Sequence, residues 1–374
     1  MKYRLSFLSL FMSLLFISCF TTQKTTEVTA TASVSNVESS IKTPKNIIFM
    51  VGDGMGISQI TAGMYMNNNK LALERCTHVG LIKTHSSNNL ITDSAAGATA
   101  FACGQKTYNG AIGVNDAKEP LKTILESAED RGMETGLVAT STIVHATPAS
   151  YAAHQPSRKM YDEIAAEMIT ADVEVMIGGG KMYFEAATRA DKQDLIKVLK
   201  EKKYTVADDV KDVTADADKI MVFTAADDPK KKMDGRDYLM PASELAIERL
   251  SKSEDGFFLM IEGSQIDWGG HANDSEYIIT EMLDFDETVA KVLDFVEKDG
   301  ETLLVITADH ETGGYAINPE SVMNDTIVAG FTTGYHTATM IPVFAHGVGA
   351  ENFSGIYENT AIYDKMMAAL RLEK

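Results

Sequence analysis

Continuous apolar runs of strand length, separated by amphipathic stretches, constrain the fold of this chain more than any other feature. Seven such runs lie at Asn46–Val51, His78–Ile82, Gly136–Ala139, Val173–Ile177, Phe257–Ile261, Leu303–Thr307 and Ile341–Ala345. Helical patterns lie between several of them, at Leu121–Arg131, Tyr161–Thr170, Ala242–Ser251 and Tyr277–Lys298. Strands that are apolar on both faces need cover on both faces, so this alternation predicts an α/β fold with a central, mostly parallel sheet flanked by helices.

The length and composition allow a large core. The chain has 374 residues, of which 45% are hydrophobic and 23% charged, so folding requires neither a disulfide nor a metal. Residues 181–240 are more polar and irregular than their surroundings, which predicts a small insertion over the ligand-binding end of the sheet. Cys76 and Cys103 would form either one bridge in an oxidising compartment or two buried apolar side chains, and the sequence leaves both alternatives open.

The first residues are typical of an export signal. Two basic residues precede an apolar run at 5–17 that is too short to span a bilayer, so we predict a signal peptide at residues 1–18. The letters LLFISC, which end at Cys19, resemble a bacterial lipobox, in which the cysteine becomes lipidated after cleavage. Residues 19–43 have no strand or helix period and are expected to form a flexible tether. The alternative is release into the periplasm without a lipid.

The chain is strongly acidic. Its formal net charge is −19 at pH 7, and removal of the signal peptide would take away two positive charges and no negative ones. Such a surface repels nucleic acids and anionic lipid headgroups, so we expect no nucleic-acid partner and membrane contact only through the lipid anchor. A site for an anionic substrate on this chain requires a local concentration of positive charge.

Acidic residues and histidines follow three of the predicted strands. In chain order they are Asp53, then Glu262, Asp267 and His271, and then Asp309 and His310. The carboxyl ends of parallel strands meet at one edge of a sheet, where open α/β folds bind their ligands. Carboxylates and imidazoles gathered there from distant parts of the chain predict a site for several metal ions, and this pair of ligand types suits zinc.

Each of these residues has a plainer interpretation when it is taken alone. Asp53 in the segment GDGMG could cap a turn, and the segment lacks the third glycine of a dinucleotide-binding loop. Asp267 and His271 are four residues apart, which places both on one side of a helical turn but is also common on protein surfaces. His336 precedes the last apolar run, where a single histidine is usually structural. Their combination favours metal ligation.

Two further segments supply groups for an anion. Ser94 lies in the run TDSAAGATAF, in which Asp93 precedes it and small side chains follow it, so that other groups can approach the start of a helix closely. The segment VHATPASYAAHQPSR supplies, in this order, His145, Thr147 and Arg158. The planar fork of an arginine can bind two oxygens of a phosphate.

Taken together, these segments resemble the alkaline phosphatase family in content and order. The resemblance covers residues 45–374 and rests on six motifs, which are GDGMG, TDSAAGATAFACGQKTYNGAIGV, HATPAS with SR, EGSQIDWGGHAN, TADHETGG and GYHTATMIPVFAHG. It is strongest to the short bacterial type, because only 27 positions separate Asp309 from His336. The resemblance implies one catalytic domain at 44–374, hydrolysis of phosphate monoesters and, commonly, a homodimer.

The resemblance also implies roles for individual residues. Ser94 matches the nucleophile that forms a phosphoserine intermediate, and Arg158 matches the phosphate-binding arginine. The implied ligands of two Zn²⁺ ions are Asp267, His271 and His336 for one ion, and Asp53, Asp309 and His310 for the other. A third site, usually for Mg²⁺, corresponds to Asp53, Thr147 and Glu262. We expect Asp93 to orient the local backbone and Arg158 rather than to act as a base.

Two positions depart from the common bacterial pattern. His145 stands where an aspartate is common, and Trp268 stands where a lysine is common. His145 leaves the occupant of the third site open between Mg²⁺, Zn²⁺ and Mn²⁺. The missing lysine removes a positive charge near the product, so we expect weak inhibition by inorganic phosphate and fast product release.

Other functions fit parts of the sequence. A phosphodiesterase or a sulfatase of the same superfamily would share the metal ligands, but sulfatases need a C/S-x-P-x-R segment that the nucleophile region lacks. Diesterases typically use a threonine and lack the arginine. A metal-storing lipoprotein without activity would not need a nucleophile. The presence of Ser94, Arg158 and every matched ligand favours the phosphomonoesterase.

Overall fold

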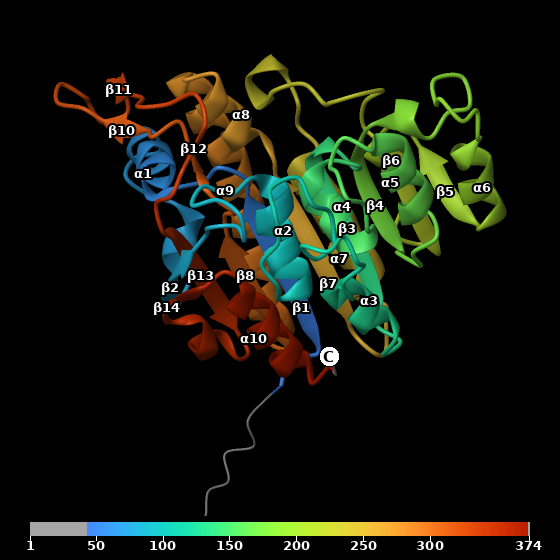
Figure 1. The fold of residues 1–374 in the computed structure, drawn as a ribbon. Helices are drawn as coiled ribbons and strands as arrows, with labels where there is room; N and C mark the ends of the chain where they lie inside the picture. The colour runs from blue at the N-terminus through green and yellow to red at the C-terminus, as the bar shows by residue number, and fades with distance from the viewer. Residues whose placement is uncertain (1–42, 373–374) are drawn as a thin grey trace, which may run out of the picture. The chain divides into compact units, whose positions relative to one another are not determined.

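The structure, a computed structural model, describes residues 43–372 and shows a large sheet between two layers of helices (Figure 1). The predicted signal peptide at 1–18, the predicted lipidation site Cys19 and all but the last residue of the predicted tether at 19–43 lie outside the described residues. Within the described part of the chain, no helix has both the length and the apolar character needed to cross a bilayer.

The main sheet has ten strands. They are β1 (Asn46–Gly52), β2 (His78–Lys83), β3 (Glu134–Thr142), β4 (Val175–Gly179), β5 (Tyr204–Ala207), β6 (Lys219–Phe223), β7 (Phe257–Gly263), β8 (Thr302–Thr307), β13 (Ile341–Gly347) and β14 (Gly355–Glu358). Their order is β14-β2-β13-β8-β1-β7-β3-β4-β6-β5. Neighbours are parallel except at β13, which runs antiparallel to both β2 and β8. The predicted mostly parallel sheet is confirmed.

Helices cover both faces of this sheet. They are α1 (Ile57–Met66), α2 (Ser94–Cys103), α3 (Ile124–Glu129), α4 (Ala146–Ala152), α5 (Tyr161–Met168), α6 (Leu195–Glu201), α7 (Leu239–Leu250), α8 (Gln265–His271), α9 (Ser275–Asp299) and α10 (Thr360–Leu370). Helices α3, α4 and α10 pack on one face of the central strands, and α7 and α9 pack on the other (Figure 1). Every residue of β1, β7 and β8 is therefore buried, which explains their continuous apolar sequences.

Two short antiparallel pairs lie outside the main sheet. Strand β9 (Glu311–Thr312) pairs with β12 (His336–Thr337), and β10 (Ala316–Ile317) pairs with β11 (Ala329–Gly330). The first pair matters for function, because it brings His336 back to the chain that leaves β8. The seven predicted strands and four predicted helices are all present, with ends shifted by a few residues.

Residues 181–240, predicted as an irregular insertion, divide into two parts. The first part forms α6, β5 and β6, and β6 pairs with β4 so that the sheet becomes wider at its edge. The strands of this part were not predicted, because runs of four or five residues carry too short a pattern to be recognised among polar neighbours. The second part, residues 224–238, crosses the end of β3, where the Thr142 N–H donates to Asp228 Oδ1 at 3.1 Å. This part covers the sheet end as predicted.

Both cysteines in the described chain are free thiols, which favours the second of the two predicted alternatives. Cys76 follows the 3-10 helix η1 (Ala72–Arg75), Cys103 ends α2, and both pack against the hydrophobic core. Burial raises the pKa of both thiols, that of Cys76 to about 12. A raised pKa keeps a thiol protonated and unreactive, so these cysteines act as small apolar side chains.

A buried ion-pair cluster fixes the segment 224–238 to α9. Arg236 Nη2 lies 2.6 Å from Glu281 Oε2 and 2.7 Å from Asp284 Oδ2, and all three side chains are at most 3% exposed. Lys232 Nζ adds a second ion pair with Asp284, at 2.6 Å. The removal of one partner from such a cluster leaves an uncompensated charge in the interior.

We expect Arg236→Ala to lower the free energy of unfolding by about 3–5 kcal/mol, because Glu281 and Asp284 would stay buried without their cation. Urea denaturation followed by circular dichroism measures this change. The control is Lys197→Ala, which removes an exposed pair with Glu201 and should change stability by less than about 0.5 kcal/mol. Equal effects of the two substitutions would contradict the anchoring role of the cluster.

Candidate active site

The predicted acidic residues meet because three neighbouring strands end together. Val51 of β1 pairs with Thr307 of β8 on one side and with Glu262 of β7 on the other. Asp53 and Asp309 each follow two residues beyond this level of the sheet. The strand register therefore brings three carboxylates from distant parts of the chain to one end of the sheet.

Helix α2 begins at this end of the sheet with Ser94 as its first residue. Asp93 caps the helix, since its Oδ1 accepts hydrogen bonds from the N–H groups of Ala96 and Gly110, both at 3.0 Å. The other carboxylate oxygen, Oδ2, pairs with Arg158 Nη1 at 3.1 Å. Asp93 therefore contacts both the first turn of α2 and Arg158.

One group of side chains surrounds the Ser94 hydroxyl. His310 Nε2 lies 3.3 Å from Ser94 Oγ, 3.2 Å from Asp309 Oδ2 and 3.5 Å from Asp53 Oδ1. The two carboxylates and the imidazole are fully buried. Asp309 and His310 are adjacent in sequence, and both can face one point because the chain is irregular between β8 and β9.

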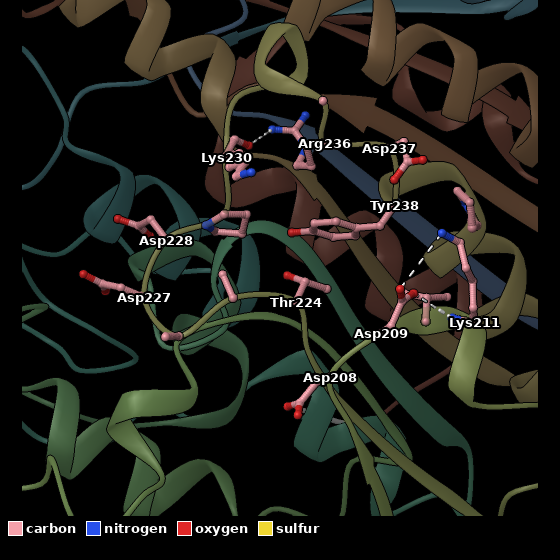
Figure 2. Close-up of a pocket in the computed structure, with 16 residues that line it drawn as sticks. Asp208, Asp209, Lys211, Thr224, Asp227, Asp228, Lys230, Arg236, Asp237 and Tyr238 are labelled. Atoms are coloured by element: carbon pink, nitrogen blue, oxygen red, sulfur yellow. Dashed lines mark hydrogen bonds and ion pairs between the residues drawn. The ribbon is translucent and has the colours of Figure 1, made fainter.

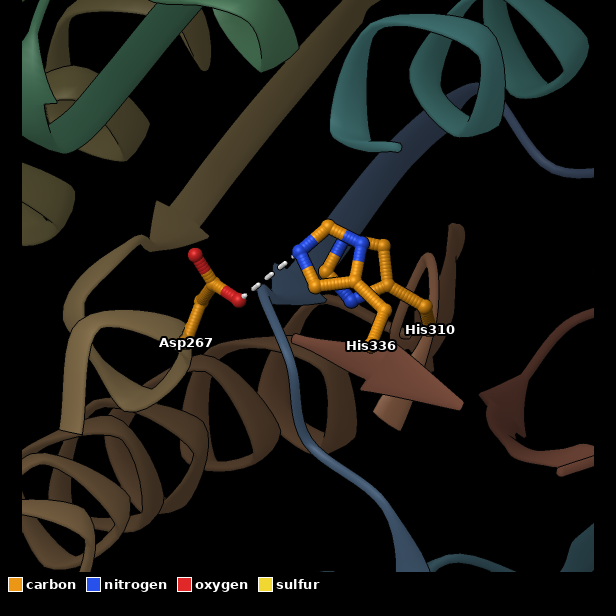
Figure 3. A group of neighbouring side chains, drawn as sticks. All are labelled: Asp267, His310 and His336. Carbon is orange, nitrogen blue, oxygen red and sulfur yellow. Dashed lines mark ion pairs between the residues drawn. The ribbon is translucent and has the colours of Figure 1, made fainter. Parts of the chain in front are cut away.

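A second group lies beside the first. Asp267 and His271 both belong to α8, and their four-residue spacing places His271 Nε2 3.4 Å from Asp267 Oδ2. His336 enters from β12, with its Nε2 3.5 Å from Asp267 Oδ1 and 3.0 Å from His271 Nε2. Figure 3 shows Asp267, His310 and His336 side by side, and the two imidazole rings stack with centroids 3.5 Å apart. The two groups therefore form one cluster.

Backbone carbonyls set the tautomers of two histidines. His271 Nδ1 lies 2.9 Å from the Gly334 carbonyl, and His336 Nδ1 lies 2.8 Å from the Thr92 carbonyl. A carbonyl only accepts hydrogen bonds, so both Nδ1 atoms carry the hydrogen. Burial also lowers the pKa of His336. The two Nε2 atoms therefore face each other across 3.0 Å, a contact that is repulsive unless a proton or a metal ion binds the lone pairs.

Thr312 sets the tautomer of the third histidine. Its hydroxyl donates to Asp267 Oδ1 and lies 3.2 Å from His310 Nδ1, so it accepts the hydrogen on that nitrogen. Burial, with a smaller contribution from the neighbouring histidines, lowers the pKa of His310 well below its usual value. His310 consequently presents an unprotonated Nε2 to the first group.

The carboxylate oxygens of the cluster lack donors. Both oxygens of Asp53 and Oδ2 of Asp309 are buried and have no hydrogen-bond partner within residues 43–372. Burial and the charges of neighbouring carboxylates raise the pKa of Asp53 well above its usual value and that of Asp309 to about 7. Bound cations would supply a partner for each buried oxygen and would offset the repulsion between the carboxylates.

The spacing of the donor atoms fits metal ions. Ligand atoms at about 2.0–2.2 Å from a tetrahedral Zn²⁺ lie about 3.3–3.6 Å from one another, and the four imidazole-to-carboxylate separations above are 3.2–3.5 Å. Two sets of three residues each offer donor atoms that all lie within 4.8 Å of one another. One set is Asp53, Asp309 and His310, and the other is Asp267, His310 and His336. The residues therefore fit two metal ions that share this cluster.

A third set of oxygens adjoins Asp53. Glu262 is close enough for its charge to raise the pKa of Asp53, and its Oε2 accepts a hydrogen bond from Ser264 Oγ at 2.8 Å. Glu262 Oε1 and the Thr147 hydroxyl are buried, and neither has a partner among the described residues apart from the contact between Glu262 and Thr147 themselves. Burial raises the pKa of Glu262 to about 7. Carboxylate and hydroxyl oxygens of this kind suit a hard cation such as Mg²⁺.

His145 and Trp268, the two departures from the common pattern, lie beside Arg158. Burial and the Arg158 charge lower the pKa of His145 to about 3, so its neutral ring accepts a hydrogen bond from Arg158 Nη2 across 3.2 Å. Trp268 meets His145 edge to face, with ring centroids 6.0 Å apart. The guanidinium is thus held on one edge by Asp93 and on another by His145.

A cavity of about 260 Å³ opens onto these residues. Its lining consists of Asp93, Ser94, His145, Arg158, Asp267, Trp268, His271, Tyr335 and His336. Tyr335 and Thr312 were missed from sequence, because an aromatic residue or a threonine near a metal ligand is a weak signal. A larger cavity of about 580 Å³ lies among residues 208–241 and contains none of the predicted site residues (Figure 2). The smaller cavity is therefore the candidate active site.

The residues of this site match a known family in their order along the chain. The alkaline phosphatase family model matches residues 44–329. The chain belongs to the alkaline phosphatase family. Alkaline phosphatase 3 of Bacillus subtilis is 35% identical over 416 residues, which cover 87% of this chain and 89% of that protein. The alkaline phosphatase family match ends before His336, whose place in the site rests on the geometry above.

Solved alkaline phosphatases have the same fold. The enzyme of the Antarctic bacterium TAB5 has a TM-score of 0.85 and 43% identity, and the match covers 89% of this chain and 100% of that chain. A histidine-to-aspartate variant of that enzyme, with Mg bound in its M3 site, has a TM-score of 0.84 and 42% identity over the same shares of the two chains. The protein is thus a metal-binding hydrolase of phosphate monoesters.

Gly97 allows α2 to lie close to the cluster, and the small side chains after Ser94 had predicted such a close approach. A Cβ atom at this position would lie 2.9 Å from Asp309 Cβ, which is nearer than such atoms approach in proteins. Alanine in place of glycine within a helix normally stabilises it by about 0.8–1 kcal/mol. The contact with Asp309 reverses that gain, because the helix or the carboxylate must move.

We expect Gly97→Ala to weaken metal binding and to lower kcat/KM at least about tenfold, because displacement of Asp309 by a few tenths of an ångström disturbs the geometry of the cluster. Competition with a zinc chelator and a phosphatase assay measure the two effects. Gly63→Ala in α1 is the control, since its new Cβ meets the side chain of Met282 and no residue of the cavity lining. Parent-like zinc affinity in Gly97→Ala would contradict the close-approach argument.

Proposed function

We propose that the chain hydrolyses phosphate monoesters through a phosphoserine intermediate at Ser94, with two Zn²⁺ ions and one Mg²⁺ ion as cofactors. One observation carries the proposal. Ser94 Oγ stands at the start of α2, 3.3 Å from His310 Nε2 and among buried carboxylate oxygens that have no donor in the described chain. The proposed ligands are Asp53, Asp309 and His310 for one Zn²⁺, Asp267, His271 and His336 for the other, and Asp53, Thr147 and Glu262 for Mg²⁺.

Arg158 and the start of α2 are proposed to receive the phosphoryl group. The contacts with Asp93 and His145 fix the plane of the Arg158 guanidinium and leave its other N–H groups for two phosphoryl oxygens. The free N–H groups in the first turn of α2 add partial positive charge. These groups, with the cations, supply the local positive charge that a chain of net charge −19 needs to bind an anion.

Two successive displacements complete the proposed reaction. The Ser94 hydroxyl loses its proton, Oγ attacks phosphorus, the bond to the leaving alcohol breaks, and the leaving oxygen takes up a proton from solvent. Water then loses a proton and attacks the phosphoserine, and Ser94 Oγ departs and is protonated again as inorganic phosphate forms. When bound, the two Zn²⁺ ions supply Lewis acidity that lowers the pKa of the Ser94 hydroxyl and of water and offsets charge on the leaving oxygen.

We further propose that the chain is exported and anchored by a lipid on Cys19, with 19–43 as a tether and 44–374 as the catalytic domain. The signal-peptide pattern and the lipobox-like letters before Cys19 support this proposal. Release into the periplasm without a lipid is the alternative. A homodimer is proposed on the family resemblance alone.

We expect hydrolysis of p-nitrophenyl phosphate to rise from pH 6 into the alkaline range, to be lost on chelation and to return with Zn²⁺, with a further gain from Mg²⁺. Ser94→Ala should lower kcat at least roughly 10³-fold. Its zinc content, measured by atomic absorption, should equal that of the parent protein, which separates a lost nucleophile from a lost metal site.

Three outcomes of this experiment would favour the alternatives. Faster turnover of bis-p-nitrophenyl phosphate than of the monoester would indicate a phosphodiesterase, and turnover of a sulfate ester would indicate a sulfatase. No turnover with full metal occupancy would indicate a metal-storing protein. Parent-like activity of Ser94→Ala would exclude the phosphoserine intermediate.

We expect Trp268→Lys to tighten inhibition by inorganic phosphate about tenfold, because a lysine beside Arg158 adds a charge-assisted contact to the product. Product inhibition constants measured in steady state test this expectation. Trp268→Met is the control, since it replaces the ring without adding charge. An unchanged or weaker inhibition by phosphate in Trp268→Lys would contradict the proposed effect of the missing lysine.

A further inference from the structure

Tyr335 lies at the opening of the active-site cavity, and the fold does not depend on its hydroxyl. The residue is 45% exposed, lines the cavity and makes no side-chain hydrogen bond within the described chain. Its ring stacks on the His336 ring with centroids 4.2 Å apart and planes at 10°, and its centroid lies 5.9 Å from that of His271. One face of the aromatic ring is thus fixed by His336, while much of the residue remains open to solvent.

The direction of the reaction places the leaving group near this ring. In-line displacement puts the leaving oxygen on the side of phosphorus opposite the attacking Ser94 Oγ. Ser94 belongs to the group around His310, so the leaving oxygen faces the other group, which contains His271 and His336. Atoms attached to that oxygen extend towards Tyr335.

Trp268, the other large aromatic side chain of the lining, has a different neighbour. It packs on His145, which in turn contacts Arg158, so it lies beside the groups that receive the phosphoryl oxygens.

The cavity is too small to enclose a drug-sized substrate completely. Its volume of about 260 Å³ is below the roughly 300–1,000 Å³ of pockets that bury a drug-sized ligand. Part of a larger leaving group must therefore rest on the rim, where Tyr335 offers an exposed planar surface beside His336.

We propose that Tyr335 binds the leaving group by stacking, and that the enzyme therefore favours phosphate monoesters whose alcohol carries an aromatic ring close to the ester oxygen. This inference rests on the proposed function of the site. Offset or edge-to-face contact between two rings adds to plain apolar burial, so an aromatic leaving group gains more than an aliphatic one. The contact forms when substrate binds, so its effect appears mainly in KM.

The test compares benzyl phosphate with ethyl phosphate, whose leaving alcohols are of similar basicity. With Zn²⁺ and Mg²⁺ supplied, we expect Tyr335→Leu to lower kcat/KM for benzyl phosphate about three- to tenfold, chiefly through KM, and to leave ethyl phosphate within about twofold. Tyr335→Phe keeps the ring and should keep the parent protein's ratio of kcat/KM between benzyl and ethyl phosphate. Met340→Ala, at an exposed apolar residue outside the cavity lining, should match the parent protein on both substrates.

Each other outcome has a definite meaning. An equal loss on both esters in Tyr335→Leu would overturn the inference, because it would show that the ring acts by holding His336. No loss on either ester would also overturn it. Turnover of ethyl phosphate by Tyr335→Leu shows that the variant is folded and loaded with metal. A parent protein that hydrolyses neither ester would overturn the proposed function, and the inference with it.

Discussion

The repulsion among carboxylates crowded into the interior is the constraint on which the rest of this structure depends. Asp53, Glu262 and Asp309 reach one point because β8, β1 and β7 end in register, and burial raises the pKa of all three. The surrounding groups are arranged to present unprotonated donors to this point. Two backbone carbonyls and Thr312 fix the Nδ1 hydrogens, so that each Nε2 faces inward. The site is therefore built for cations before any substrate is considered.

The candidate metal ligands could be proposed from sequence because most of them follow a recognisable element. Asp53 comes directly after a continuous apolar strand, and the four-residue spacing of Asp267 and His271 placed both on one turn of a helix, as in the structure. The groups that orient the ligands left no comparable pattern. The carbonyls of Gly334 and Thr92 belong to the backbone, which carries no sequence signal, and their positions depend on how β12 returns to β9.

The fold, too, was predictable only in part. The apolar runs identified the buried centre of the sheet, since burial on both faces demands a continuous apolar sequence. They gave neither the spatial order of the strands nor the antiparallel direction of β13, because those depend on long-range pairing. Strands β5 and β6 were not predicted, for a different reason. They have only four and five residues, and one polar residue is enough to remove the pattern of so short a strand.

The position of β2 has a consequence for the order in which the chain assembles. In the sheet β2 pairs with β13 and β14, the last two strands of the described chain, so it has no neighbour until nearly the whole chain has been synthesised. Such long-range pairing is slow, because a large loop must close before any contact is gained. His336 belongs to β12, the strand that comes before β13 in the chain. The late step that completes this edge of the sheet therefore also delivers the final histidine, and a nascent chain has no complete metal site before it has a complete fold.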